Sequence, residues 1–194
     1  MRFTLGPDSA LIIVDVQKDF CPGGALPVPR GDDVVSILNR YIQKFMEAGA
    51  RIYATRDWHP PTHKSFTPHG GPWVPHCVQN TVGAEFHEDL RLPRTAKVIS
   101  KATDPEKETY SGFDRTGLGA VLRRQGVRWV FVGGLATDYC VKHTVLDALT
   151  LGFVTVLLED AIRGVEVQPG DSARAIAEMV AQGAQTAQLS EVGI

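Results

Sequence analysis

The sequence has few cysteines, no long apolar run and almost no excess of charge. Its three cysteines among 194 residues lie far apart and form no CxxC pair, which argues against a disulfide framework and favours a reducing cytoplasm. No apolar run approaches the ~20 residues of a membrane span, and the N-terminus has no signal-peptide pattern. A net charge of −2 gives no reason to expect nucleic acid or an anionic membrane as a partner. We therefore expect a small-molecule substrate.

The length and composition are those of an ordinary globular protein, with 43% hydrophobic and 22% charged residues. A chain of 194 residues is long enough for one sizeable core and short for two, so we expect a single domain over residues 1–194. The sequence contains no internal repeat and no low-complexity segment. It leaves open whether the protein forms a homo-oligomer.

Apolar, β-rich runs alternate with helical patterns along the chain. This alternation implies right-handed βαβ units and predicts an α/β fold: a three-layer α/β/α sandwich with a six-stranded, mostly parallel sheet. The predicted strands cover residues 10–16, 51–57, 96–101, 128–132, 154–158 and, weakly, 184–189, and the predicted helices about 33–48, 117–125, 137–151 and 171–182.

Four reactive side chains stand at the ends of successive predicted strands. Asp15, Asp57 and Lys101 close the first three strands, and Cys140 follows the fourth. Ligands of parallel α/β sheets bind beyond the carboxyl ends of the strands. We therefore expect these four residues to lie together at one edge of the sheet.

Cys140 is the candidate nucleophile. Thr137 is a candidate N-cap, which would place the sulfur of Cys140 in the first turn of a helix, where the dipole favours a thiolate. Asp15, desolvated among apolar residues, suits a proton acceptor, and Lys101 could balance its charge. The backbone N–H groups of Ala136 and Cys140 are candidate oxyanion-hole donors. The alternative is an inert, buried cysteine.

A second set of residues suits a divalent metal ion. Asp57 and His59 lie two apart at a strand end, and His63 and His76 follow in a loop region at about 57–95 that holds five of the six histidines. Carboxylate and imidazole together suit zinc, iron or manganese. His63 is the least certain ligand, and Cys77 could compete with it. The alternative is a hydrogen-bonded loop without a metal.

Aromatic side chains near the same strand ends could wall a pocket for a flat ring. These are Phe20, Trp73 and Tyr110, and the alternative for each is ordinary packing under long loops.

With these residues identified, the sequence resembles the nicotinamidases (pyrazinamidases) of the isochorismatase-like cysteine hydrolases along nearly its whole length. The motifs that carry the resemblance are Leu11–Phe20, Thr55–Pro60, His76–Asn80, Tyr110–Phe113 and Gly133–Val141. The resemblance implies a parallel six-stranded sheet between helices and hydrolysis of nicotinamide to nicotinate and ammonia, in NAD salvage. It also implies one divalent metal ion per subunit, with zinc first and iron or manganese as alternatives.

Position by position, the resemblance assigns a role to each candidate residue. It implies Cys140 as nucleophile, Asp15 as base and Lys101 as its cationic partner; Asp57, His59 and His76 as metal ligands, with His63 ligating in only some members; Phe20 and Trp73 as ring contacts; and a cis peptide bond at Leu135–Ala136.

The sequence departs from the family pattern at two positions, and three other functions compete with the resemblance. Val74 stands where a proline commonly follows the tryptophan, and Ala102 where a glycine often follows the lysine. The rivals are an amidase for ureido substrates, a hydrolase with a metal-bound water as nucleophile, and a non-catalytic binding protein. The histidine-rich loop favours a substrate with a ring nitrogen over a ureido compound.

Overall fold

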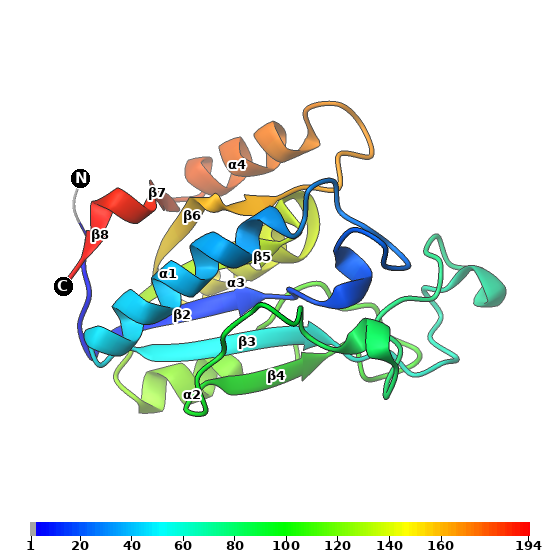
Figure 1. The fold of residues 1–194 in the computed structure, drawn as a ribbon, viewed down its shortest axis with the longest axis horizontal. Helices are drawn as coiled ribbons and strands as arrows, with labels where there is room; N and C mark the ends of the chain where they lie inside the picture. Colours follow the sequence, from blue (N-terminus) through cyan, green and yellow to red (C-terminus); the bar gives the residue numbers. More distant parts are fainter. Residues whose placement is uncertain (1–2) are drawn as a thin grey trace.

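The structure is a computed structural model that describes residues 3–194. Its centre is a six-stranded sheet in the order β4-β3-β2-β5-β6-β7, and all neighbouring strands run parallel (Figure 1). The strands are β2 (Ser9–Val14), β3 (Arg51–Asp57), β4 (Lys97–Lys101), β5 (Trp129–Leu135), β6 (Val154–Arg163) and β7 (Gln185–Ala187). The helices are α1 (Asp33–Glu47), α2 (Leu118–Arg124), α3 (Lys142–Thr150) and α4 (Asp171–Ala181). The predicted α/β fold with a parallel six-stranded sheet is confirmed.

Helices cover both faces of the sheet, and β2 shows how the sequence divides between them. Leu11 and Ile13 belong to the core under α1, whereas Ala10, Ile12 and Val14 belong to the core under α2, α3 and α4. Successive side chains of a strand point to opposite faces, so a strand covered on both sides reads as one continuous apolar run. In Figure 1, α1 lies in front of the sheet and α3 behind it.

Several strands differ from the sequence predictions: β2 ends at Val14 rather than residue 16, and β5 runs to Leu135 rather than residue 132. β6 runs to Arg163 rather than ending near residue 158, and its register with β5 shifts between Val132 and Gly134. A second, two-stranded sheet pairs β1 (Phe3–Thr4) with β8 (Val192–Gly193). Segments of two residues are too short to show a periodic pattern, which is why the sequence gives no sign of them.

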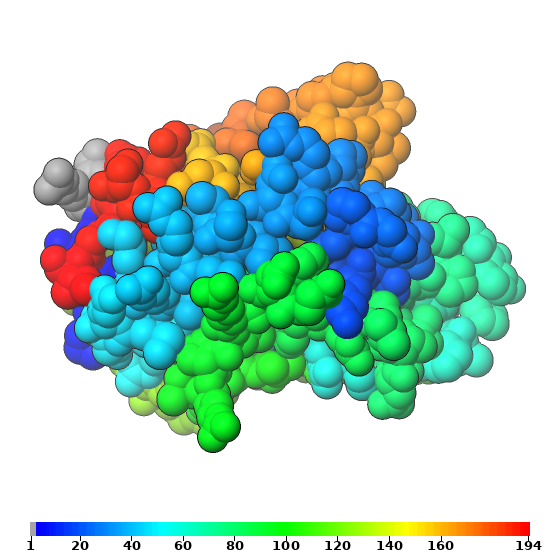
Figure 2. All heavy atoms as spheres, viewed as in Figure 1, coloured from blue at the N-terminus to red at the C-terminus, as the bar shows by residue number. Residues whose placement is uncertain are grey.

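The loop region that follows β3 forms one end of the molecule, beyond the carboxyl ends of the strands (Figures 1 and 2). It contains two short 3-10 helices, Thr67–His69 and Val82–Ala84, and isolated bridges such as that between His59 and Val78. Two further 3-10 helices are Lys18–Phe20 and Leu189–Glu191. Among residues 3–194, no helix combines the length and hydrophobicity needed to cross a membrane.

Candidate active site

The four residues expected at the strand ends do lie together. Asp15 follows β2, Asp57 ends β3, Lys101 ends β4, and Cys140 lies in the turn that follows β5. These strands are neighbours in the order β4-β3-β2-β5. Neighbouring parallel strands therefore deliver all four side chains to the same edge of the sheet.

Lys101 is the centre of this buried cluster. Its Nζ lies 2.8 Å from Asp15 Oδ2, 2.5 Å from Asp57 Oδ1 and 3.4 Å from Cys140 Sγ. An ammonium group has three N–H donors, and here three acceptors surround it. The contact with Asp15 is an ion pair without good hydrogen-bond alignment, and Asp15 Oδ2 makes no well-aligned hydrogen bond to any described residue. That oxygen is left able to accept a proton.

Burial and charge set the protonation states of the cluster. Burial raises the pKa of Asp15 above that of an ordinary carboxyl, although the Lys101 cation opposes the effect. Burial tends to lower the pKa of Lys101, but Asp15 and Asp57 outweigh it and raise that pKa well above 10.5, so the amine stays charged. Burial also raises the pKa of the Cys140 thiol well above 9, against Lys101. Burial therefore opposes the thiolate expected from the helix start, which favours a role for a base beside Cys140.

The segment before Cys140 differs from the expected helix start. Thr137–Val141 forms a single π-helical turn whose N-cap is Ala136, and the N-cap of α3 is Val141. The prediction that Thr137 caps the helix was therefore wrong, because the chain enters α3 through a wider turn. The Leu135–Ala136 peptide bond is cis, as the resemblance implied. Gly134 has φ 121°, and a Cβ there would lie 2.2 Å from the Val14 carbonyl oxygen, so the close approach of β5 to β2 requires glycine.

Asp57, His59 and His76 form a group whose ligand atoms all lie within 4.8 Å of one another. The Nδ1 atoms of His59 and His76 lie 3.1 and 2.7 Å from backbone carbonyl oxygens, those of His76 and Val74. A carbonyl only accepts, so each Nδ1 carries the proton and each Nε2 keeps a lone pair. Burial, with the neighbouring histidines, lowers the pKa of His59 to about 2, which keeps this ring neutral. These properties fit a metal site.

His63 has the opposite arrangement. Its Nδ1 accepts a hydrogen bond from the backbone N–H of Ser65 at 3.2 Å, so the proton is on Nε2, which lies 3.2 Å from the carbonyl oxygen of Lys107. Both ring nitrogens are thus engaged, and His63 would have to leave these bonds to ligate a metal. Its ligand atoms group instead with those of His59 and Glu108.

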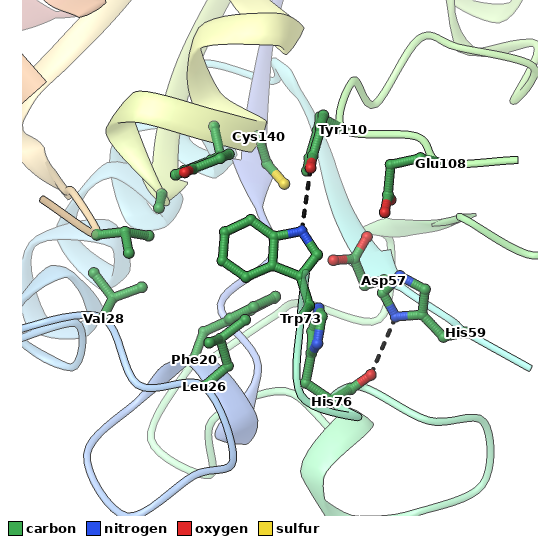
Figure 3. Close-up of a pocket in the computed structure, with 13 residues that line it drawn as sticks. Phe20, Leu26, Val28, Asp57, His59, Trp73, His76, Glu108, Tyr110 and Cys140 are labelled. Carbon is green, nitrogen blue, oxygen red and sulfur yellow. Dashed lines mark hydrogen bonds between the residues drawn. The ribbon is translucent and has the colours of Figure 1, made fainter. Parts of the chain in front are cut away.

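A small cavity opens beside both groups. Cys140, Asp57, His59 and His76 face it, and the three aromatic residues predicted from the sequence line it (Figure 3). Trp73 Nε1 donates a hydrogen bond to the hydroxyl oxygen of Tyr110 at 3.2 Å, which joins two of these aromatics. A mostly apolar wall with a few polar groups is typical of a small-molecule site. The aromatic lining residues are Phe20, Trp73, Tyr110 and Tyr139.

Several lining residues were not predicted from the sequence, namely Leu26, Val28, Glu108, Tyr139 and Val165. Leu26 and Val28 come from the loop after Phe20, and Val165 comes from the segment after β6. Glu108 had one available signal, since it lies in the charged loop that follows Lys101, two residues before Tyr110. The apolar lining residues gave no such signal in the sequence, because apolar loop residues usually pack against the core.

The two departures from the family pattern have local explanations. The carbonyl oxygen of Val74 accepts a hydrogen bond from His76 Nδ1, and a proline at this position would offer the same carbonyl oxygen. Val74 itself is 44% exposed. Ala102 has φ 54°, in the left-handed region where glycine carries no Cβ penalty. Neither departure removes a group from the cluster.

The fold and the site together define an α/β enzyme with its reactive groups at the carboxyl edge of a parallel sheet. The chain belongs to the isochorismatase family, since a family model described as the isochorismatase domain matches residues 9–191. It is similar to the nicotinamidase of Escherichia coli (strain K12), with 43% identity over 92% of this chain and 93% of that one.

Solved structures give the same result. The pyrazinamidase of Pyrococcus horikoshii in complex with zinc has a TM-score of 0.90 and 55% identity, covering 94% of this chain and 99% of that one. PnC1 from L. infantum in complex with nicotinate has a TM-score of 0.93 and 38% identity, covering 99% and 98%.

Proposed function

We propose that this protein is a nicotinamidase, which hydrolyses nicotinamide to nicotinate and ammonia in NAD salvage and also accepts pyrazinamide. The observation that carries the proposal is the buried Asp15–Lys101–Cys140 cluster beside a three-ligand group in one small cavity. The similarity to nicotinamidases and to a zinc-containing pyrazinamidase supports it. On this proposal residues 1–194 act as one hydrolase domain.

The chemistry begins with a proton transfer. Asp15 accepts the proton of the Cys140 thiol, and Sγ attacks the carboxamide carbon. The oxyanion rests on the backbone N–H groups of Ala136 and Cys140. Asp15 then returns the proton to the leaving nitrogen, the C–N bond breaks, and ammonia departs from a thioester of Cys140.

Hydrolysis of the thioester completes the cycle. A water molecule gives one proton to Asp15 as its oxygen attacks the acyl carbon, and the C–S bond breaks to release nicotinic acid. The acid loses its remaining proton to solvent and becomes nicotinate. Asp15 then returns the proton to the sulfur of Cys140. Lys101 stays charged throughout, since its pKa lies well above 10.5, and it stabilises the thiolate at each stage.

The proposed metal ligands are Asp57, His59 and His76, with His63 as a fourth candidate that would have to turn. When bound, a divalent ion such as zinc supplies a positive centre that can hold a pyridine nitrogen or a water. Phe20, Trp73 and Tyr110 would contact the ring.

Ammonia release tests the proposal directly. We expect turnover of nicotinamide and pyrazinamide, no turnover of a ureido compound, and loss of activity with chelator. Turnover of the ureido compound alone would identify a different amidase. Alkylation of Cys140, with nicotinate present as a protecting ligand in a parallel sample, should stop turnover only in the unprotected sample. Full activity after complete alkylation would contradict the thioester route.

A further inference from the structure

We propose that Gln17 and Asp19 are positioning residues of the metal site, which hold Asp57 and His76 in place through the protein backbone. The inference rests on the proposed function, because it takes Asp57, His59 and His76 as the ligands. Neither Gln17 nor Asp19 lines the cavity. Each acts on the peptide groups from which the ligand side chains project.

Gln17 is fully buried, at 0% exposure, and its side chain holds both backbone groups of Asp57. Oε1 accepts a hydrogen bond from the N–H of Asp57 at 2.8 Å, and Nε2 donates to the carbonyl oxygen of Asp57 at 2.8 Å. The second N–H of the amide donates to the carbonyl oxygen of Ala84 at 2.9 Å. One side chain therefore fixes the position of Asp57 and ties it to the 3-10 helix Val82–Ala84 in the loop region after β3.

The course of the sheet explains why Asp57 needs this support. The ladder between β2 and β3 ends at the pair Val14 and Thr55, because Asp15 turns the chain away with φ 48°. Asp57 extends two residues beyond that point, so no backbone of β2 is available to pair with it. Toward Asp57 the amide of Gln17 presents one donor and one acceptor, as a peptide group does, and it continues the ladder in place of β2.

Asp19 supports the backbone beside a second proposed ligand, His76, in the same way. Its Oδ2 accepts a hydrogen bond from the N–H of Cys77 at 2.7 Å, and its Oδ1 accepts from the N–H of Ala25 at 3.1 Å. Cys77 directly follows His76 and has φ 45°, a conformation that a non-glycine residue adopts only with support. The carbonyl oxygen of Cys77 also accepts from the N–H of His59 at 3.0 Å. A charged acceptor at Cys77 thus steadies the backbone beside two ligands.

Gln17 and Asp19 belong to one short segment, residues 15–20, which supports several parts of the site. The segment begins with the proposed base, Asp15, and ends with Phe20 on the cavity wall. Between them it holds the ligand-bearing end of β3, at Asp57, and the ligand-bearing loop at His76. Loss of groups that orient metal ligands typically weakens metal affinity by about 10–100-fold. We expect that range for loss of either contact.

The test measures zinc affinity of the full chain, stripped with chelator and titrated in competition with a chromogenic chelator. Gln17→Met removes all three hydrogen bonds at similar length, and Asp19→Asn keeps the size but leaves one acceptor for two N–H groups. The control is Gln125→Met, which removes a glutamine hydrogen bond to Tyr53 at the other end of β3. We expect zinc binding about 10–100-fold weaker in the first two variants and unchanged in the control.

Thermal unfolding of each variant in excess chelator separates positioning from folding. Wild-type affinity in folded Gln17→Met and Asp19→Asn would overturn the inference, and Asp19→Asn decides alone if Gln17→Met does not fold. Equal weakening in Gln125→Met would also overturn it, since the effect would then be a general loosening of β3. An Asp57→Ala arm tests the underlying site: if that variant binds zinc like the wild type, the proposed ligand set is wrong and the inference falls with it.

Discussion

Lys101 Nζ and Asp57 Oδ1 lie 2.5 Å apart, so the cation beside Cys140 is ion-paired with a proposed metal ligand. The two halves of the site therefore share one carboxylate. We therefore expect any change at Asp57 to affect the proposed nucleophile as well as the proposed metal site. His76 has no such link to Lys101 among the described contacts, which makes the two ligands separable by mutation.

Replacement of the two ligands should have different effects on stability. Asp57→Ala and His76→Ala should both weaken zinc binding, but only Asp57→Ala removes a partner from a buried ammonium. Breaking a buried ion pair typically costs about 3–5 kcal/mol. Chemical denaturation in excess chelator should show Asp57→Ala less stable than His76→Ala by roughly that amount. Equal stability of the two variants would mean that Asp15 alone is sufficient to stabilise the buried charge of Lys101.

Removal of the sulfur should separate chemistry from metal binding. In Cys140→Ala no nucleophile remains, so we expect turnover of nicotinamide to fall by at least about 10³-fold. Zinc affinity should be unchanged, because the proposed ligands are elsewhere. Ammonia release and zinc titration on the same preparation check both parts. Substantial turnover by this variant would exclude Cys140 as the nucleophile.

The acid limb of the pH–rate profile should report Asp15, which must be ionised to accept a proton. Burial raises its pKa above 3.8, so kcat/KM should fall with decreasing pH earlier than for an ordinary carboxyl. Thr55 donates a hydrogen bond to Asp15 Oδ1 at 2.6 Å, which favours the ionised form. Thr55→Val should therefore move the acid limb upward by about one pH unit.

Saturating zinc is the control for that profile, since metal loss at low pH would otherwise imitate the titration. An acid limb at the same pH in Thr55→Val and wild type would show that Asp15 does not set it. No loss through Lys101 is expected up to pH 10, because its pKa lies well above 10.5.

Asp138 should affect substrate binding more than chemistry. Its carboxylate oxygens accept hydrogen bonds from the N–H groups of Val165 and Glu166, both at 2.9 Å, and Val165 lines the cavity. Asp138→Ala should loosen this wall and raise KM for nicotinamide about 10-fold, with a smaller change in kcat. Steady-state kinetics give both values. A fall in kcat with KM unchanged would place Asp138 with the reacting groups instead.

Ala102→Gly should stabilise the protein. Ala102 has φ 54°, which costs a residue with a Cβ roughly 1–2 kcal/mol, while the added chain entropy of glycine offsets about 0.5–1 kcal/mol. We expect a net gain of about 0.5–1 kcal/mol in the free energy of unfolding. Gly134→Ala is the opposite case, because its Cβ would overlap Val14, and it should be strongly destabilising. Urea denaturation checks both, and a destabilised Ala102→Gly would contradict the backbone argument.

Sequence patterns predicted the strands and the convergence of the reactive residues because these depend on local apolar runs and on a general rule of parallel sheets. The predicted strand at residues 51–57 has the bounds of β3, and Asp15, Lys101 and Cys140 meet as expected. The similarity to nicotinamidases is also confirmed by the comparisons. The proposed roles of the individual residues stay predictions.

Features that depend on distant backbone groups could not be predicted. The π-helical turn at Thr137–Val141 differs from an ordinary helix start only in its hydrogen-bond spacing, which no residue type specifies. Gln17 was predicted to be a loop residue, because the two partners of its side chain, Asp57 and Ala84, lie 40 and 67 positions away in the chain. The contact of His63 Nε2 with the carbonyl oxygen of Lys107 likewise joins residues 44 positions apart.

The four residues of the buried cluster lie at the ends of four different strands. Activity therefore requires the complete sheet. No continuous fragment of one or two βα units contains Asp15, Asp57, Lys101 and Cys140 together. Contacts between such distant parts of a chain form slowly in folding and depend on the complete sheet. We therefore expect refolding to restore ammonia release only after secondary structure has largely returned. Partial unfolding at any of these four strands should abolish ammonia release.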